Sequence, residues 1–570
     1  MRITRAHAVE RILRAEGGFT MLIAIGVLFV SGLLMVAAFT VANNDTHLSH
    51  VDTVQKQAYY AALAGIQEYE YRLESEPNYW ETCGAPSGWV AEAKSERYEI
   101  NLLAANGKSK CESSKPFETM IESTGVAANT FRLESVGCAG KAELTTCVGQ
   151  PHSTVAVRKV VASFRVTGFL QFVYFTRFED EDPTLYSPKA SCERYYIEKS
   201  STRSSECQQI QFITGDNVNG PMHSDDTAVV CGEPEFGRPG HSPLDKVEIN
   251  GGLHESCGAK PIFNTESKSY SKGRELIPPA SDESLLSYVE SANTFSGVTQ
   301  LVLNGTTNQI KVINNGTEKT VSWPENGLIY VGKGSGTCSF AYTGHEADGP
   351  AEKTQETNCG NVYVHGTYSK SLTIAAENDV IINGNTYPTS VTTLGTEPSG
   401  TAALGLIATH FVRVYHPVKE TYAATKGSSG YTCSNGDTLN GTLCEYENSQ
   451  GGCDAPDLTA SEDEKAGGYG WGVQKNIWIY AAILSTKHSF AVDNYNCGGQ
   501  LGELNVYGAI AQNFRGIVGT GGGGGGGGGG TGYIKNYNYD QRLATDEPPY
   551  FLEPLNTGWE VARETAPEAG

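Results

Sequence analysis

The longest apolar stretch of the chain lies near its N-terminus. From Phe19 to Ala42 no side chain carries a charge, and polar residues follow directly from Asn43. A run of about 24 residues, at ~1.5 Å per helical residue, is long enough to cross the ~30 Å hydrocarbon core of a bilayer. The pattern therefore predicts a membrane-spanning helix over residues 19–42.

After this run the apolar positions take on a helical period. Apolar residues recur at three- and four-residue steps from Asp45 to Glu76, and Pro77 then ends the pattern. We expect one helix over residues 19–76, amphipathic from 43 to 76, which needs packing partners along its length. Its apolar face holds the small residues Ala58, Ala61, Ala62 and Gly65. These residues would allow close packing against neighbouring helices, against the chain's own sheet, or against both at different heights.

Alternation of apolar and polar residues replaces the helical period in the next part of the chain. The clearest alternating runs are 97–102, 130–136 and 154–166, and each predicts a β-strand. A long helix followed by an antiparallel sheet that covers its apolar face is an α+β arrangement. We therefore predict a β-rich head over residues 77–175.

Residues 176–570 predict an all-β domain. Short runs of β-branched and aromatic residues alternate with Gly, Asn and Asp, without helical periodicity. Such short strands with Gly and Asn corners favour a right-handed parallel β-helix, a solenoid of stacked coils, and a β-sandwich is the alternative. Loop insertions are expected at 266–294 (with a short helix over 282–291), at 418–468 and at 519–532, where a glycine run lies. The tail, residues 533–564, is expected to cap the open edge of the solenoid.

Charge and cysteine content narrow the function. A net charge of −22 over 570 residues speaks against nucleic-acid binding. There are 14 cysteines, and none precedes Cys83, so all fall after the predicted membrane span, where thiols can oxidise. Connectivity is not fixed by sequence. Proximity suggests the pairs Cys83–Cys111, Cys138–Cys147, Cys192–Cys207, Cys231–Cys257 and Cys338–Cys359.

The segment before the apolar run is short and basic. Arginine outnumbers the acids there, which predicts a cytoplasmic N-terminus with everything beyond Asn43 outside the cell. A secretory signal carries its small-residue cleavage site after the apolar region. Here the distinctive junction, Gly17-Gly18-Phe19-Thr20, comes before it. The order of basic leader, Gly, Phe-Thr, apolar helix and amphipathic continuation resembles the class III leader of type IV prepilins.

This resemblance implies processing and assembly. Prepilin peptidase would cut after Gly18, removing the leader 1–18, and Phe19 would become the methylated first residue. Phe19, Thr20 and the residues after them would then enter the filament core. Most pilins carry glutamate at the fifth mature position, but here that position is Ile23. Minor pilins and the tip pseudopilin of type II secretion include members without this glutamate, so the resemblance favours a minor subunit.

The function that we expect is structural. The chain would be a minor, tip-located subunit of a type IV pilus or related pseudopilus, anchored by a single membrane pass before assembly and displayed on the cell surface afterwards. Its partners would be other pilin subunits, prepilin peptidase and the membrane. An alternative is a pilus-associated adhesin that binds a surface carbohydrate or protein. A membrane-anchored β-helix enzyme acting on polysaccharide is the third possibility.

One predicted turn concentrates residues that could bind a metal ion or act as a catalytic acid or base. Asp216, His223, Asp225 and Asp226 lie within residues 215–226. Carboxylates on such a turn could hold Ca²⁺ or serve glycoside hydrolysis, whereas the simpler interpretation is that Asp, Asn and Gly form tight turns. No Gly-x-Ser-x-Gly, Walker or His-Glu-x-x-His motif occurs. We therefore expect no enzymatic activity and no cofactor, with Ca²⁺ at the three aspartates as the one candidate.

Overall fold

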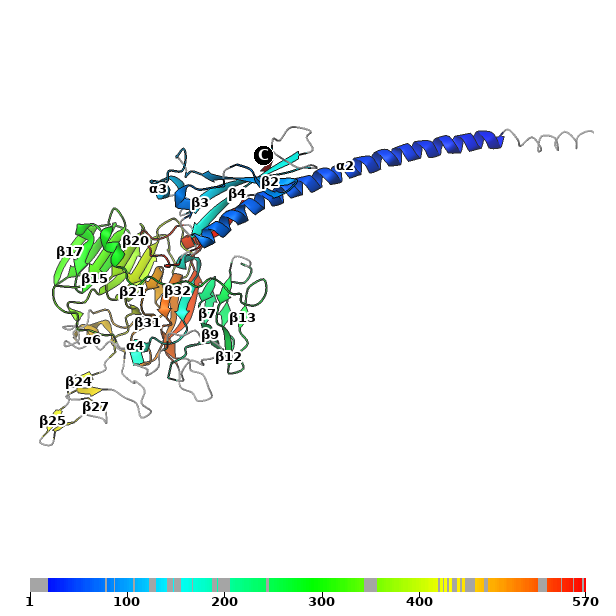
Figure 1. Ribbon diagram of the computed structural model, residues 1–570. Coiled ribbons are helices and arrows are strands. Elements are labelled where there is room, and N and C mark those ends of the chain that lie inside the picture. Colours follow the sequence, from blue (N-terminus) through cyan, green and yellow to red (C-terminus); the bar gives the residue numbers. More distant parts are fainter. Residues whose placement is uncertain are drawn as a thin grey trace, which may run out of the picture. The chain divides into compact units, whose positions relative to one another are not determined.

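The structure is a computed structural model of the 570-residue chain. The residues described are mostly β-strand, with few helices and one long apolar helix near the N-terminus (Figure 1). The leader residues 1–18, with Gly18, lie outside them. The structure describes residues 19–76, 79–86, 88–105, 108–121, 130–140, 147, 155–166, 168–186, 192, 206–241, 245–342, 356–418, 421–423, 425–427, 430–432, 438–440, 443–445, 457–465, 470–520, 530–544, 546–556, 558–565 and 568–569.

The chain divides into two compact units. Unit 1 comprises Met1–Ser123, Asn129–Val166 and Gly558–Gly570, and unit 2 comprises Thr124–Ala128 and Thr167–Thr557. The chain thus leaves unit 1 after Val166 and returns to it at Gly558. Unit 2 is therefore an insertion within the sequence of unit 1.

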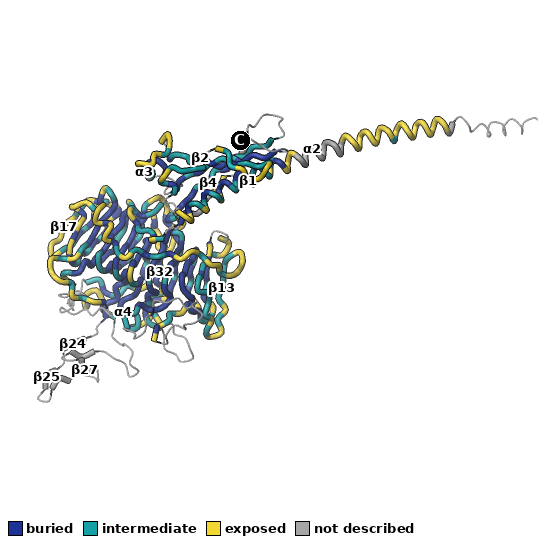
Figure 2. The backbone as a smooth tube through the Cα atoms, in the orientation of Figure 1, coloured by how far each residue is buried: buried dark blue, intermediate teal, exposed yellow. Residues whose placement is uncertain are grey.

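Helix α2, Phe19–Ser75, is continuous over 57 residues, as the periodicity predicts. Its segment Met21–Thr40 has a mean hydropathy of 2.7 and none of it is buried in the protein. By length and composition this segment could cross a membrane. Figure 2 shows it as an exposed stretch, whereas the C-terminal part of the helix has a buried face.

The C-terminal half of α2 packs on an antiparallel sheet in unit 1. Tyr69 and Leu73 lie in one apolar cluster with Phe131 and Phe164. The sheet has the strand order β1-β2-β3-β4-β35, and β36 also pairs with β4. The bounds are β1 Val90–Ala93, β2 Glu96–Leu103, β3 Thr130–Gly140, β4 Val155–Val166, β35 Trp559–Glu564 and β36 Glu568–Ala569, with a 3-10 turn η1 Tyr79–Thr82 and a short helix α3 Pro116–Met120.

Strand β35 corrects the prediction for the C-terminal tail. It pairs antiparallel with β4, Trp559 opposite Val166, and so completes the sheet of unit 1 instead of capping the all-β domain. The physical reason is that Trp559 fills the aromatic cluster of unit 1, where its ring centroid lies 4.8 Å from that of Phe131 and 5.4 Å from that of Trp80. The earlier part of the tail, β34 (Thr531–Tyr539), pairs in parallel inside the sheet of unit 2.

Unit 2 is built on a curled sheet of 22 strands. Most of its pairings are parallel and join strands that are distant along the chain. The first ladder joins β14 Thr294–Ser296, β18 Leu328–Gly332, β20 Leu372–Ala376, β22 Leu404–Ala408, β30 Ala482–Ser485, β32 Gln500–Phe514, β5 Tyr174–Phe178, β8 Met222–Ser224 and β11 Val247–Ile249.

The register of this ladder stacks apolar side chains in the core. One row of directly paired residues, all of them buried, is Ile329, Ile374, Leu406, Ile483, Ile510, Tyr174, Met222 and Val247. Because every paired strand presents an apolar residue at this level, a one-residue slip would turn the row outward, and the register is strongly specified.

A second ladder lies across the same core. Its strands are β15 Thr299–Asn304, β16 Gln309–Asn314, β17 Thr317–Ser322, β19 Val362–Tyr368, β21 Val380–Pro388, β23 Val412–Val414, β29 Trp478–Ile479, β31 Phe490–Val492, β33 Gly519–Thr520, β34, β7 Asn217–Asn219, β10 Glu235–Phe236 and β13 Ile262–Phe263. Strands β15, β16 and β17 are antiparallel neighbours. One smaller sheet consists of β6 Gln211–Ile213, β9 Thr227–Cys231 and β12 Gly252–Ser256. Another consists of β24 Thr421–Ala423, β27 Thr438–Asn440 and β28 Leu443–Glu445. Strands β25 Thr425–Gly427 and β26 Gly430–Thr432 form a two-stranded sheet.

The predicted insertions differ from one another. Within 266–294, the expected short helix is two 3-10 turns, η4 Glu283–Ser287 and η5 Ser291–Asn293. Leu276 and Leu285 of this segment are buried in one cluster with Phe175 and Tyr330, so the segment covers the outer face of the first ladder. The insertion 418–468 contains strands β24–β28 and helix α6 Ala460–Lys465, and residues 521–529 of the glycine run lie outside the described residues. Other short elements are η3 Phe169–Gln171, α4 Pro183–Tyr186 and η6 Gln541–Ala544.

Candidate functional site

The turn predicted as a calcium candidate is buried. Asp216 lies just before β7 and Lys535 lies on the adjacent β34, because Asn217 pairs with Asn536. The Lys535 ammonium donates to Asp216 Oδ2 at 2.8 Å, and the Ile213 N–H donates to the same oxygen at 3.0 Å. Burial lowers the pKa of Lys535. Asp216 is thus bound by the chain's own donors.

The next residues of the turn form a separate network around His223. Its Nε2 lies 2.9 Å from Asp225 Oδ1 and its Nδ1 lies 2.8 Å from Glu248 Oε2. The ring is buried beside Phe172 and Phe175, with ring centroids 5.1 and 5.7 Å away. Burial alone would lower the pKa of His223, but the hydrogen bonds to the two carboxylates outweigh it and raise the pKa to about 9. At neutral pH the imidazole is therefore protonated, and it lies between the carboxyl groups of Asp225 and Glu248.

The remaining carboxylates of the turn also bind protein donors. Asp226 accepts from the Glu179 N–H at 2.9 Å and from the Thr227 N–H at 2.8 Å. Asp225 accepts in addition from Asn250 Nδ2 and from the Leu276 N–H. Among the described residues, Asp216, Asp225 and Asp226 form no group whose carboxylate oxygens lie within 4.8 Å of one another, and each accepts hydrogen bonds from the protein itself.

A geometric metal candidate exists elsewhere among the described residues, at Asp180, Cys192 and Cys207. The two cysteines form a disulfide, so they offer no thiolate to a metal. The same five cysteine pairs that proximity suggests lie at disulfide distance, with Cα separations from 4.5 Å for Cys338–Cys359 to 6.1 Å for Cys138–Cys147. Oxidised cysteines fit an extracellular location for the β-rich part.

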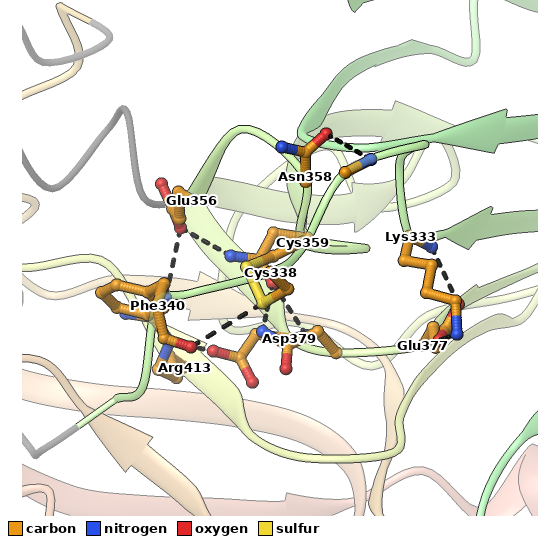
Figure 3. Close-up of a disulfide and its surroundings, with 12 residues drawn as sticks. Lys333, Cys338, Phe340, Glu356, Asn358, Cys359, Glu377, Asp379 and Arg413 are labelled. Atoms are coloured by element: carbon orange, nitrogen blue, oxygen red, sulfur yellow. Dashed lines mark hydrogen bonds and ion pairs between the residues drawn. A yellow bond between two sulfur atoms is a disulfide. The ribbon is translucent and has the colours of Figure 1, made fainter.

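A second charged cluster lies beside the Cys338–Cys359 disulfide (Figure 3). Arg413 of β23 is fully buried and donates to Asp379 at 3.1 Å and to Asp493 at 2.9 Å. Its guanidinium carbon lies 4.5 Å from the ring centroid of Tyr342, and one nitrogen lies 3.8 Å from Glu356. The carboxylates surround the cation inside the protein, so their negative charges compensate the buried guanidinium.

The small residues of α2 meet the chain's own sheet. Ala58, Ala61 and Ala62 have no exposed surface. A Cβ atom added to Gly137 of β3 would overlap Ala58 O and Ala62 N, so the helix and the strand touch backbone to backbone. Gly65 is buried against Ser135 and Tyr98. Of the two alternatives for these residues, the structure shows packing on the sheet of unit 1.

Unit 2 holds a pocket of about 500 Å³ at the ends of strands β5, β30 and β32. Asp182 and His488 lie at its base. His488 Nδ1 is 2.5 Å from Asp182 Oδ2, and Asp182 Oδ1 accepts from the Thr184 N–H and hydroxyl at 2.8 and 2.6 Å. Phe411 stacks on the His488 ring at 4.5 Å. These contacts fix the orientation of the imidazole. Its other ring nitrogen, Nε2, has no hydrogen-bond partner among the described residues.

The turn that carries His488 is held rigidly. Thr486 and Lys487 donate their backbone N–H groups to Ala408 O and Thr409 O, and Lys487 O accepts from Asn513 Nδ2 at 3.0 Å. The Lys487 side chain itself is exposed. The turn and Asn513 of β32 thus bring an ammonium group, an imidazole and an amide to the lining of the pocket.

The apolar wall of the pocket comes from two distant segments. Leu555 N–H donates to Ile277 O at 2.8 Å, and Ile277 N–H donates to Asn556 Oδ1 at 2.8 Å. Asn556 Nδ2 returns a bond to Glu275 O at 2.7 Å. Pro278 and Pro279 continue this wall and stiffen it, because proline fixes φ. Leu555 is 68 % exposed, so part of the wall faces solvent.

Sequence reasoning did not find this pocket. Its lining comes from segments near residues 177–184, 277–280, 486–488, 513–514 and 555, and no local motif joins them. Comparison with protein families, with curated proteins and with solved structures finds no match to the chain. The function must therefore be argued from the geometry.

Proposed function

We propose that the chain is a minor, tip-located structural subunit of a type IV pilus or a related pseudopilus. In this proposal α2 anchors the subunit in the membrane before assembly and enters the helical core of the filament afterwards. Unit 1 is the pilin-type head. Unit 2 is a right-handed parallel β-helix, an interpretation supported by the in-register parallel ladders described above.

The single observation that carries the proposal is the division of α2 into two halves. The C-terminal half is buried on the sheet of unit 1, whereas Met21–Thr40 makes no buried contact within the chain. An isolated apolar helix of this kind is not stable in water, so it requires a bilayer or the apolar helices of other subunits. A filament subunit that moves from membrane to helical bundle needs both environments.

Two further features support a minor subunit. Ile23 is an exposed apolar residue at the position where a pilin-type assembly would use a carboxylate. Unit 2 is a large insertion between β4 and β35, and such a volume on every subunit would crowd a thin filament. A place at the tip avoids this crowding.

N-terminal mass spectrometry of the mature protein from its own cells tests the proposal. The expected N-terminus is Phe19 carrying a methyl group. Gly18→Leu is the matched control and should leave the leader attached, because a bulky residue replaces the glycine before the cut. An intact Met1 in the native protein, or a cut beyond Ala42, would sink the pilin interpretation.

Assembly is tested separately through Ile23. Ile23→Glu supplies the carboxylate typical of abundant subunits. For a tip subunit, the copy number per filament should stay low, as measured by quantitative mass spectrometry of sheared filaments. A rise of the variant to shaft-like abundance would contradict the tip location.

A further inference from the structure

The pocket at Asp182 and His488 has a charge that differs from the rest of the chain. The protein carries a net charge of −22, yet two permanent cations, Arg177 and Lys487, line this pocket. Of the acids near them, Asp182 is buried and bound to His488 and Thr184. Glu275 lies 3.8 Å from Arg177, at a rim that is open to solvent. Lys487 has no carboxylate partner among the described residues, so its ammonium group can bind a ligand with a negative group.

The Asn513 amide and the His488 imidazole have fixed positions. Lys487 and Asn513 are joined through the Lys487 carbonyl, and His488 is held by Asp182 and by stacking on Phe411. Because the orientation of the imidazole is set before any ligand arrives, a hydroxyl bound at Nε2 costs little ordering entropy. The Asn513 and His488 groups can thus bind neutral hydroxyls beside a charge bound by Lys487 and Arg177.

The apolar wall supplies the other half of the recognition. Ile277, Pro279 and Leu555 contribute aliphatic surface to the same pocket. A sugar ring combines these properties, since its C–H face is apolar and its edge carries hydroxyls. A pocket of about 500 Å³ lies within the range of ordinary small-ligand sites.

From these three observations we propose that the pocket binds an acidic saccharide, with a sugar carboxylate at Lys487 and Arg177, hydroxyls at His488 and Asn513, and the C–H face of the ring on Ile277 and Leu555. The site lies entirely within unit 2 and does not depend on leader processing or filament assembly. Failure of the filament proposal would therefore leave it standing, and the reverse also holds.

Calorimetric titration of the detergent-solubilised full chain with oligogalacturonate tests the proposal. Binding is expected, and Lys487→Glu should weaken it about tenfold or more, because a charge-assisted contact is replaced by repulsion. Lys333→Glu is the matched control. Lys333 is also an exposed lysine of unit 2, paired at 3.5 Å with Glu377 (Figure 3), and it lies outside the pocket, so this change should leave the affinity within twofold.

Further measurements test whether the pocket recognises an acidic sugar or any small anion. A neutral gluco-oligosaccharide should bind at least tenfold more weakly than oligogalacturonate, and Leu555→Asp should weaken the acidic ligand without lowering the melting temperature, since Leu555 is exposed. Competition by inorganic phosphate at equal concentration would show a site for a simple anion and would overturn the saccharide proposal. Absence of oligogalacturonate binding, or equal loss in Lys333→Glu and Lys487→Glu, would also overturn it.

Discussion

Arg413 and Asp493 form an ion pair inside unit 2, with Nη1 of the arginine 2.9 Å from Oδ1 of the aspartate and neither side chain exposed. Asp379 receives a second bond from the same guanidinium at 3.1 Å. A buried pair of this kind is weak evidence of net stabilisation, because both charges lose their hydration. Removal of one partner is nevertheless destabilising, because the remaining charges then stay buried without compensation.

Arg413→Met should therefore lower the free energy of unfolding of unit 2 by about 3–5 kcal/mol. Hydrogen exchange with mass spectrometry reports the stability of each unit separately, and the loss should appear in the peptides of β21, β23 and β31. The control is Lys333→Met, which breaks a solvent-exposed pair and should cost at most about 1 kcal/mol. Equal effects of the two substitutions would contradict the interpretation of the Arg413 cluster.

The contact between α2 and β3 predicts a contrast between two glycines. A Cβ at Gly137 would overlap the helix backbone at Ala58 and Ala62, which cannot move without displacing α2. A Cβ at Gly65 would meet the side chains of Ser135 and Tyr98, of which the first can rotate away. Gly137→Ala should thus destabilise unit 1 by roughly 3 kcal/mol.

Gly65→Ala should lower the free energy of unfolding of unit 1 much less, because the helix propensity of alanine offsets up to about 1 kcal/mol of the strain. Thermal unfolding followed by exchange in α2 and β3 measures both variants. If Gly65→Ala proved the more damaging substitution, α2 and β3 would not approach each other as closely as described.

Strand β35 predicts that unit 1 depends on the last residues of the chain. Trp559 is 9 % exposed and its ring contacts Phe131 and Trp80. Trp559→Ala should cost unit 1 about 3–5 kcal/mol, as expected for the loss of a large core side chain, while exchange in unit 2 stays unchanged. Tyr60→Ala removes an aromatic residue of α2 that is 63 % exposed and serves as the control with little effect. An unaltered unit 1 in Trp559→Ala would argue against the pairing of β35 with β4.

Much of the fold follows from local patterns. The helix and strands β2, β3 and β4 match the runs that periodicity marks, because the apolar faces of these elements repeat at periods of 3.6 and 2. The short runs of unit 2 also coincide with strands, such as 379–382 in β21 and 361–364 in β19. Strand pairing does not follow from local patterns. Strand β32 pairs with β5, which is more than 300 residues away in sequence, and no local signal identifies that neighbour.

The site was harder to predict for a related reason. Residues 215–226 attract attention because their carboxylates are close in sequence, yet Lys535, Glu179 and Leu276, which bind those carboxylates, come from distant segments. Conversely, Asp182 and His488 are separated by 306 residues and lie 2.5 Å apart. The tail was misplaced because Trp559 has an apolar side chain that either unit could bury, and only tertiary contacts select unit 1.

The carboxyl of Asp282 predicts how the stability of unit 2 changes with pH. Burial raises its pKa from 3.8 to about 7, although the Thr409 and Tyr330 hydroxyls donate to Oδ1 at 2.8 and 3.2 Å and oppose the shift. Oδ2 is buried without a hydrogen-bond partner among the described residues. The ionised form is thus disfavoured in the folded protein. Because the folded pKa lies above the unfolded one, the stabilisation is complete below about pH 4 and is lost as the pH rises through 7.

The Asp282→Asn variant cannot ionise at residue 282, so it does not lose this stabilisation as the pH rises. The difference in unfolding free energy between the variant and the wild type should shift in favour of the variant by about 4 kcal/mol between pH 4 and pH 8, and then level off. Urea unfolding of unit 2 at a series of pH values measures this difference. The titration of His223, whose pKa is about 9, is common to both proteins and cancels. Parallel stability curves for the two proteins across this range would show that Asp282 ionises at its ordinary pKa and is not held neutral by burial.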